Sequence, residues 1–304
     1  MPIRKAIIAP LPIFPRQYPI SCGLPTALLR LVDRDGRTKA IIQIIVEEAI
    51  ESGIESVGII GPPDLEQICR DYFRCWSEAS SRDLAGQDWA IMQSEKLAEL
   101  SERITFISQS EQSTAPDLRT ARRFVGDETF LFLPADAVYL SGTKDRVAGQ
   151  LIERSAHLHA DCISMAQVVQ RRDFHTNVVA KGELLDADRH IYRTLAIADR
   201  PPVDQESELA TPALPPGYFL SQTGMSLFSP AIFEALDSAG SIPGAIRKIA
   251  ASSSAFCIEL DGQSIDVRLP YGLLQAQLSL GLAGVHRGDL CELIARTLAE
   301  QAKS

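Results

Sequence analysis

The chain has 304 residues, of which 45% are apolar and 23% charged, and its formal net charge is −9. These values are ordinary for a soluble globular protein with one large or two small domains. An acidic chain without a basic block is a poor candidate for binding nucleic acid, and no segment approaches the ~18 consecutive apolar residues of a membrane-spanning helix. The six cysteines form no C-x-x-C pair, which favours free thiols in the cytoplasm.

The first 170 residues alternate between strand-like and helix-like patterns. Residues 5–9 are predicted to form a first strand, and residues 10–38 follow as an irregular, proline-rich stretch. Apolar side chains at helical spacing predict a helix over 39–52, which Gly53 ends. The further expected elements to residue 169 are strand 56–60, helix 64–74, helix 88–101, strand 104–109, helix 115–123, strand 130–133, helix 144–158 and strand 161–169. Such alternation predicts a three-layer α/β sandwich.

The pattern changes in the second half. Residues 175–198 are expected to form short antiparallel strands with a turn at 186–188, and residues 200–216 a surface loop rich in proline and acid. The last expected elements are strand 217–227, helix 230–239, strand 256–260 and a helical C-terminus from about residue 271.

Four segments carry a resemblance to a known family. They are Arg4–Ile8, Leu31–Asp33 with Ile42–Ala49 (IQIIVEEA), Phe124–Glu128 (FVGDE) and Gly262–Ala276 (GQSIDVRLPYGLLQA). In order and spacing the chain resembles the bacterial UTP–glucose-1-phosphate uridylyltransferases, which carry "IQYIVEEA", "FVGDEPF" and "GRRYDVGDKLGYLKA" at these places.

The resemblance implies a fold and a reaction. The fold is a nucleotidyltransferase sandwich of the Rossmann-like, glycosyltransferase-A type, with a mixed central sheet and a small antiparallel extension. It implies one domain over residues 1–304, with a nucleotide-binding half (1–170), a sugar-binding half (171–270) and C-terminal helices (271–304). The family reaction is attack by a sugar 1-phosphate on the α-phosphorus of UTP, assisted by Mg²⁺. UTP, a UDP-sugar or a sugar 1-phosphate is therefore the expected ligand.

The loop after the first strand departs from the family. The family's "GLGTR" turn uses glycines, whose backbone N–H groups approach the phosphates. Here the same positions are Pro12 to Arg16 (PIFPR), which lose donors and add bulk, and of that motif only Arg16 is kept. The lysine of the family's "PKE" is replaced by Thr26, so a cation at the triphosphate is lost. The second nucleotide loop also lacks its glycines, and Ser113 or Thr114 with Asp117 is expected to form a plain helix N-cap there.

Two aspartates match the metal ligands of the family. Asp136 follows the predicted strand 130–133, and Asp266 stands in the place of the aspartate of "DVG". Two carboxylates suit a hard cation such as Mg²⁺. The glycine of "DVG" is Arg268 here, and an arginine at this place could instead pair with Asp266 and displace the metal.

The sugar-phosphate side is partly kept. Asp199-Arg200-Pro201 is a conservative version of the family's "EKP", in which the lysine binds the sugar phosphate, and arginine binds phosphate as well. Gly224 matches the glycine of "VGRY" beside the sugar, whereas the family's glutamate for the sugar hydroxyls has no clear counterpart.

These residues leave three hypotheses open. The first is a degenerate homologue with weak or no uridylyltransferase activity, which binds a sugar phosphate or nucleotide or regulates an active paralogue. The second is an active uridylyltransferase with a remodelled nucleotide site. The third is a structural protein that uses the fold only for association, for example in a homo-oligomer.

Overall fold

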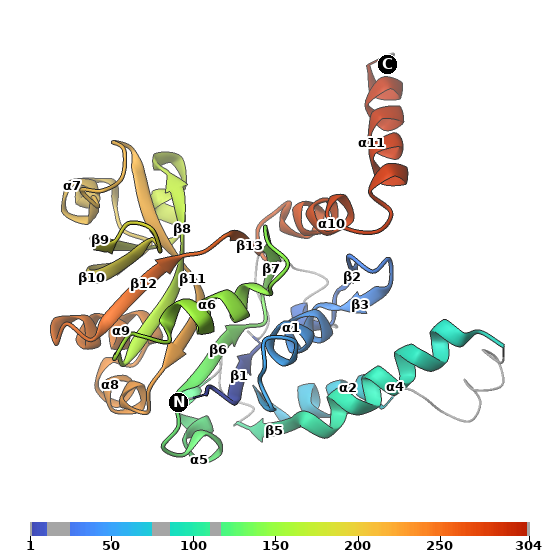
Figure 1. Cartoon of the computed structure of the whole chain (residues 1–304), viewed down its shortest axis with the longest axis horizontal. Helices are drawn as coiled ribbons and strands as arrows, with labels where there is room; N and C mark the ends of the chain where they lie inside the picture. Colours follow the sequence, from blue (N-terminus) through green and yellow to red (C-terminus); the bar gives the residue numbers. More distant parts are fainter. Residues whose placement is uncertain (1, 11–24, 75–85, 110–116, 303–304) are drawn as a thin grey trace.

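The computed structural model describes residues 2–10, 25–74, 86–109 and 117–302. In these residues nine strands form one mixed sheet in the order β5-β4-β1-β6-β11-β8-β12-β10-β9 (Figure 1). The first four strands of this order are mutually parallel, and β11 pairs antiparallel with β6. The strand bounds are β1 (Lys5–Ala9), β4 (Ser56–Gly61), β5 (Ile104–Ser108), β6 (Phe130–Pro134), β8 (Cys162–Gln170), β9 (Val178–Asp186), β10 (Ile191–Asp199), β11 (Tyr218–Phe228) and β12 (Ala255–Glu259).

Two strand pairs and the helices surround this sheet. The pairs are β2 (Arg30–Val32) with β3 (Thr38–Ala40) and β7 (Ala137–Ser141) with β13 (Gly262–Asp266). The helices are α1 (Ile41–Ile50), α2 (Pro63–Phe73), α4 (Asp88–Arg103), α5 (Arg122–Val125), α6 (Val147–Ser155), α7 (Glu206–Leu209), α8 (Ala231–Ala239), α9 (Ile242–Ala251), α10 (Gly272–Leu282) and α11 (Arg287–Gln301).

The central strands separate two hydrophobic cores. Successive side chains of a strand point to opposite faces of the sheet. Accordingly, Ala6 and Ile8 pack in a core with side chains of α1, α2 and α6, whereas Ile7 and Ala9 pack in a second core with α8 and α9. Phe130 in β6 belongs to the second core, where its ring stacks on that of Phe233 at 5.7 Å. The three-layer α/β sandwich with a mixed central sheet is thus confirmed.

The expected order of elements is largely confirmed, with four differences. The helix expected over 39–52 begins at Ile41, because Lys39 and Ala40 belong to β3. The stretch 10–38, expected to be irregular, contains the β2 strand and the start of β3. The strands β9 and β10 are nine residues each rather than short. Four further helices and strands were not predicted at all, namely β7, β13, α9 and α7, and α7 lies in the stretch 200–216 that was expected to be a surface loop.

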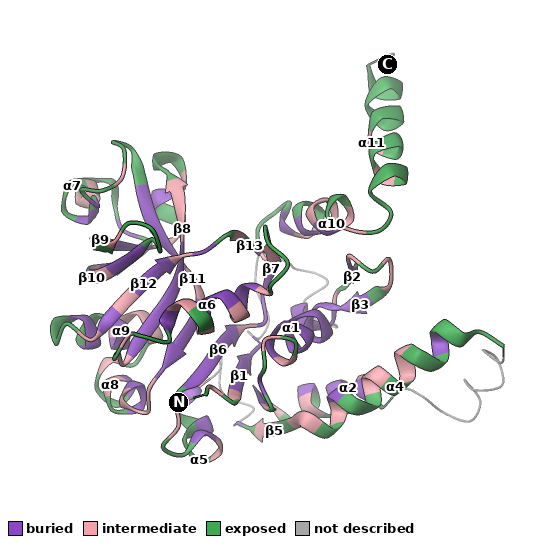
Figure 2. Ribbon diagram, in the orientation of Figure 1, coloured by how far each residue is buried: buried purple, intermediate pink, exposed green. Residues whose placement is uncertain are grey.

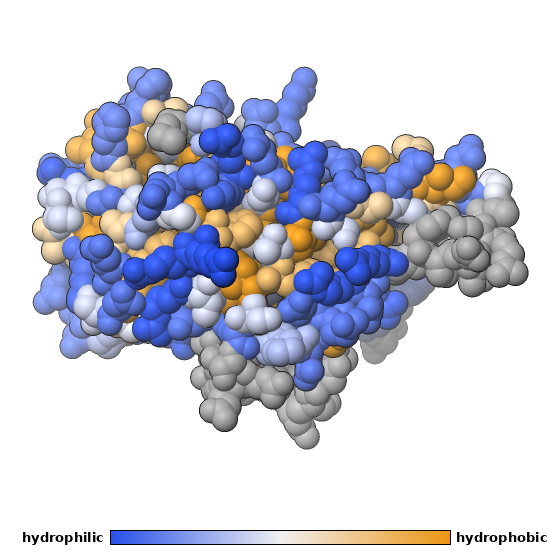
Figure 3. All heavy atoms as spheres, turned by 90° about the horizontal axis from the view of Figure 1, so that it is seen from below, coloured by the Kyte–Doolittle hydropathy of each residue, from blue (hydrophilic) through white to orange (hydrophobic). Residues whose placement is uncertain are grey.

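Helices α1 and α11 differ in how far they are buried. Helix α1 is buried along almost its whole length, whereas α11 has no buried residue and projects from the sandwich (Figures 1 and 2). On the face that Figure 3 shows, patches of hydrophobic residues lie between hydrophilic ones.

No helix in the described ranges is long and apolar enough to cross a lipid bilayer.

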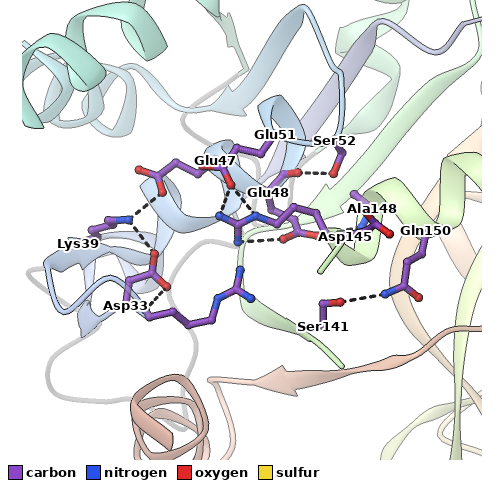
Figure 4. Close-up of polar contacts among 12 residues, drawn as sticks. Asp33, Lys39, Glu47, Glu48, Glu51, Ser52, Ser141, Asp145, Ala148 and Gln150 are labelled. Atoms are coloured by element: carbon purple, nitrogen blue, oxygen red, sulfur yellow. Dashed lines mark hydrogen bonds and ion pairs between the residues drawn. The ribbon is translucent and has the colours of Figure 1, made fainter. Parts of the chain in front are cut away.

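A buried network of charges ties α1 to the β2–β3 pair (Figure 4). The ammonium of Lys39, whose side chain is 3% exposed, lies 2.7 Å from Asp33 Oδ2 and 2.9 Å from Glu47 Oε2. It also lies 2.8 Å from Asp35 Oδ2. Burial acts to lower the pKa of Lys39, but the hydrogen bonds to Asp33 and Asp35 outweigh it, and the pKa is raised. Lys39 is therefore charged, and it neutralises the buried carboxylates of Asp33 and Glu47.

The next glutamate of α1 holds a second helix. Glu48 is buried, and its Oε1 accepts a hydrogen bond of 2.9 Å from the backbone N–H of Ala148 in the first turn of α6 (Figure 4). A carboxylate at this place satisfies a free N–H group and complements the helix dipole. Arg146 lies 3.4 Å from the same carboxylate, on Glu48 Oε2. The glutamate pair of the IVEEA segment thus fixes the positions of β3 and α6 around α1.

Candidate functional site

A cavity of about 570 Å³ lies beside the carboxyl end of β6. We call it the central cavity. Ligands of open α/β sheets bind outside the carboxyl ends of the parallel strands, so its place in the fold is typical of a binding site. Its lining includes five of the residues singled out in the sequence, namely Asp136, Asp199, Arg200, Gly224 and Asp266.

The pairing of β7 with β13 brings Asp136 and Asp266 together. Asp266 is opposite Ala137 in this pair, and the backbone N–H of Val267 donates a 3.0 Å hydrogen bond to the carbonyl oxygen of Asp136. Asp136 is 3% exposed and follows β6 directly. Two carboxylates that are far apart in the sequence therefore meet at one wall of the cavity.

Arg268 lies between these carboxylates. Its Nε and Nη2 atoms lie 2.8 Å and 2.7 Å from the two oxygens of Asp266, and its Nη1 lies 2.6 Å from Asp136 Oδ2. The Asp136 contact is an ion pair whose angles are not those of a hydrogen bond, whereas the Asp266 contact is bidentate. Burial raises the pKa of Asp136 to about 6, although the guanidinium of Arg268 acts to lower it. The described residues contain no cluster of three or more His, Cys, Asp or Glu side chains that could hold a metal ion.

The lining of the cavity also includes a positively charged side chain, that of Arg200. Arg200 follows β10, and its side chain is 65% exposed. Its backbone has φ 47°, a conformation that costs a non-glycine residue energy, and its N–H donates a 2.9 Å hydrogen bond to the carbonyl oxygen of Asn177. Asp199 lies 3.7 Å from the guanidinium and competes only weakly for it at this exposure.

Strand β11 forms part of the lining where its pairing with β8 is interrupted. The register shifts between Gln222 and Ser226, and Gly224 within this bulge has φ 89°. A Cβ at Gly224 would lie 2.8 Å from Pro134 Cγ, so only glycine fits here. Ser221 and Gln222 are buried, yet no described residue hydrogen-bonds to Ser221 Oγ or Gln222 Nε2. Buried polar atoms of this kind normally have a partner, so these two atoms leave hydrogen-bonding capacity unused in residues that line the cavity.

Comparisons with known proteins agree on one group of relatives. The chain is 26% identical to a UTP–glucose-1-phosphate uridylyltransferase of Bacillus subtilis, in an alignment that covers 92% of this chain and 91% of the relative. It is 27% identical to that of Mycoplasma genitalium, in an alignment that covers 96% of this chain and 97% of the relative. No family model matches the chain.

Solved structures show the same fold. A UDP-glucose pyrophosphorylase complexed with UDP-glucose has a TM-score of 0.72 at 20% identity and covers 91% of this chain and 97% of its own. A UTP-bound UGPase from Acinetobacter baumannii has a TM-score of 0.75 at 21% identity, with 97% and 99% covered. In sequence and in fold the chain is thus similar to the bacterial UTP–glucose-1-phosphate uridylyltransferases.

The other residues singled out in the sequence do not line the central cavity or lie outside the described residues. Thr26 is buried in a short 3₁₀ helix (Thr26–Leu28) that contacts α1, and it is not among the residues that line the central cavity. Its role in substrate binding stays a prediction. Arg16 and the rewritten loop from residue 11 to 24 lie outside the described residues. Asp117 caps a 3₁₀ helix by accepting a 3.0 Å hydrogen bond from the backbone N–H of Arg119, which confirms its part in the expected N-cap, whereas Ser113 and Thr114 lie outside the described residues.

The sequence did not identify Ser221 and Gln222 as part of the site, nor the contact between Arg268 and Asp136. Ser221 and Gln222 lie in an ordinary-looking strand, and only the packing of β11 shows that their polar atoms are buried. Arg268 was expected to pair with Asp266, but its contact with Asp136 depends on the β7–β13 pair, which was not predicted.

The raised pKa of Asp136 leads to a prediction on stability. The carboxyl is ionised at neutral pH at a cost, since its pKa of about 6 in the folded state lies above the 3.8 of an unperturbed aspartate. Because the pKa is raised, the folded state favours the protonated carboxyl. The stability that this preference provides is present at low pH and is lost as the pH rises through the pKa of the folded state. We therefore expect the free energy of unfolding of Asp136→Asn to rise relative to that of wild type as the pH is raised. From pH 5 to pH 7.5 the difference between the two proteins should change by on the order of 1 kcal/mol in favour of the variant.

Urea unfolding of both proteins at several pH values measures this difference. The matched control is Asp237→Asn, because Asp237 is 54% exposed and pairs with Arg122 on the surface. Its stability should follow that of wild type over this range. A constant difference between Asp136→Asn and wild type would contradict the raised pKa.

Proposed function

We propose that the chain binds a sugar phosphate or a UDP-sugar in the central cavity and has weak or no uridylyltransferase activity. Its relatives are named as UTP–glucose-1-phosphate uridylyltransferases, and a solved structure of the same fold is complexed with UDP-glucose. The observation that carries the proposal is the composition of the cavity wall. Arg200 offers a phosphate-binding cation, and Ser221 and Gln222 offer buried polar atoms without a partner among the described residues.

Weak catalysis follows from the nucleotide side of the sequence. Nucleotidyl transfer depends on positioning the reactants and on neutralising phosphate charge. Thr26 replaces a lysine and Pro12 and Phe14 replace glycines in the loops that serve the triphosphate in the family. The candidate residues for binding a sugar phosphate are therefore retained to a greater degree than the residues that serve the triphosphate in the family.

Calorimetry with glucose 1-phosphate, UDP-glucose and UTP, each in excess Mg²⁺ and in EDTA, tests the proposal. Pyrophosphate release from UTP and glucose 1-phosphate is measured beside an active bacterial uridylyltransferase. We expect binding of glucose 1-phosphate or UDP-glucose and little or no pyrophosphate. Pyrophosphate release comparable to that of the active enzyme would identify a functional uridylyltransferase instead, and no binding of any ligand would favour a purely structural protein.

Arg200 is predicted to carry much of the affinity. Arg200→Gln removes the charge that faces the cavity, and a hydrogen bond to a charged group contributes about 1.5–3 kcal/mol. We expect the dissociation constant for the phosphate ligand to rise roughly tenfold to a hundredfold. The matched control is Arg189→Gln in the β9–β10 turn, since Arg189 is half-exposed and does not line the cavity. Equal affinities of the two variants would place the phosphate elsewhere.

A further inference from the structure

The carboxylates of Asp136 and Asp266 are already occupied by a cation. The guanidinium of Arg268 lies within 2.6–2.8 Å of three of their oxygens. A divalent cation would need the same oxygens at about 2.0–2.6 Å. The guanidinium and a metal ion cannot both fill this space, so the residues present do not fit the metal that the family would hold here.

The position of Arg268 is fixed by its surroundings. Its backbone N–H donates a 2.8 Å hydrogen bond to Asp266 Oδ1, so the carboxylate is held by the same residue from two directions. The pairing of β13 with β7 sets both aspartates beside it. Asp136 is 3% exposed, and a guanidinium that swung away would leave this carboxylate buried without its counter-charge. Leaving a buried charge unpaired is costly, which keeps Arg268 in place.

We propose that Arg268 takes the place of the divalent cation, so that the pair Asp136–Asp266 holds a built-in guanidinium and binds no metal ion. The inference concerns the carboxylate pair itself and does not depend on which ligand the central cavity binds. A guanidinium carries one charge where a divalent cation carries two, and it has no open coordination position for a phosphate oxygen. It serves as a fixed structural cation.

A titration with Mn²⁺ tests this substitution, because Mn²⁺ takes the same oxygen ligands as Mg²⁺ and free Mn²⁺ is quantified by its electron paramagnetic resonance signal. The full chain is compared with Arg268→Ala and with Arg268→Lys, which keeps a positive charge. We expect wild type and Arg268→Lys to leave the Mn²⁺ signal unchanged. Arg268→Ala frees both carboxylates and is expected to bind one Mn²⁺ at least tenfold more tightly than wild type.

The double variant Arg268→Ala with Asp136→Asn shows whether the new site is the intended one. It should lose the affinity that Arg268→Ala gained. Circular dichroism and urea unfolding establish that each variant is folded, and Arg268→Gln, which is uncharged and longer than alanine, replaces Arg268→Ala if the latter does not fold. The proposal is overturned if wild type binds Mn²⁺ with an affinity that Asp136→Asn lowers, or if the folded uncharged variant binds no more tightly than wild type.

Discussion

Replacing Lys39 with methionine is expected to lower the free energy of unfolding by about 3–5 kcal/mol. Methionine keeps the length of the side chain but removes the ammonium that lies within 2.9 Å of Asp33, Asp35 and Glu47. Asp33 and Glu47 are 5% and 1% exposed, so water cannot solvate their carboxylates once the ammonium is lost. Removing one partner from a buried charge network leaves the others desolvated and unpaired.

The matched control for this variant is Lys96→Met. Lys96 also contacts Glu47, at 3.2 Å, but its side chain is 35% exposed. Partly exposed ion pairs contribute about 0–1 kcal/mol, so this variant should lose at most about 1 kcal/mol. Urea unfolding of both variants gives the comparison. Equal losses would show that burial of Lys39 does not set the strength of the network.

The sequence predicted the scaffold because its signals are local. Apolar residues at helical spacing identified α1, a short β-branched run identified β4, and short apolar runs identified β1 and β6. The IVEEA segment served as a family signature without a physical meaning. The structure supplies that meaning, since Glu47 binds Lys39 and Glu48 caps α6. In this part of the resemblance the two glutamates have a structural role.

The part of the site that was not predicted depends on contacts between distant segments. Strands β7 and β13 are five residues each, and each is stable only through the other, so neither has a strong pattern of its own. Helix α9 was not predicted from the sequence, and in the structure Ser241 caps it by accepting a hydrogen bond from the backbone N–H of Gly244. The ion pair between Arg268 and Asp136 links positions 132 residues apart (268 − 136) and follows only from this pairing.

Gly272→Ala is expected to lower the free energy of unfolding by about 3 kcal/mol, the upper end of the range for an overpacked position. Gly272 begins α10 directly after the turn that carries Asp266 and Arg268. A Cβ at this position would lie 2.0 Å from the carbonyl oxygen of Asp266 and 2.9 Å from Val267 Cα. Both are backbone atoms, which cannot rotate away as a flexible side chain would. The φ of Gly272 is not positive, so the cost is steric and not a matter of backbone preference.

The matched control is Gly288→Ala in α11, where nothing lies within 4 Å of the added carbon. Alanine favours a helix more than glycine by up to about 1 kcal/mol, so this variant should unfold at the same urea concentration as wild type or a higher one. If Gly272→Ala behaves in the same way, α10 can move away from the turn at no cost. The loss that we expect would instead mean that close contact between α10 and the Asp266 turn is required. It would then also explain why a glycine stands here in the segment that resembles the uridylyltransferases: the turn that positions Asp266 and Arg268 needs the backbone of α10 directly against it.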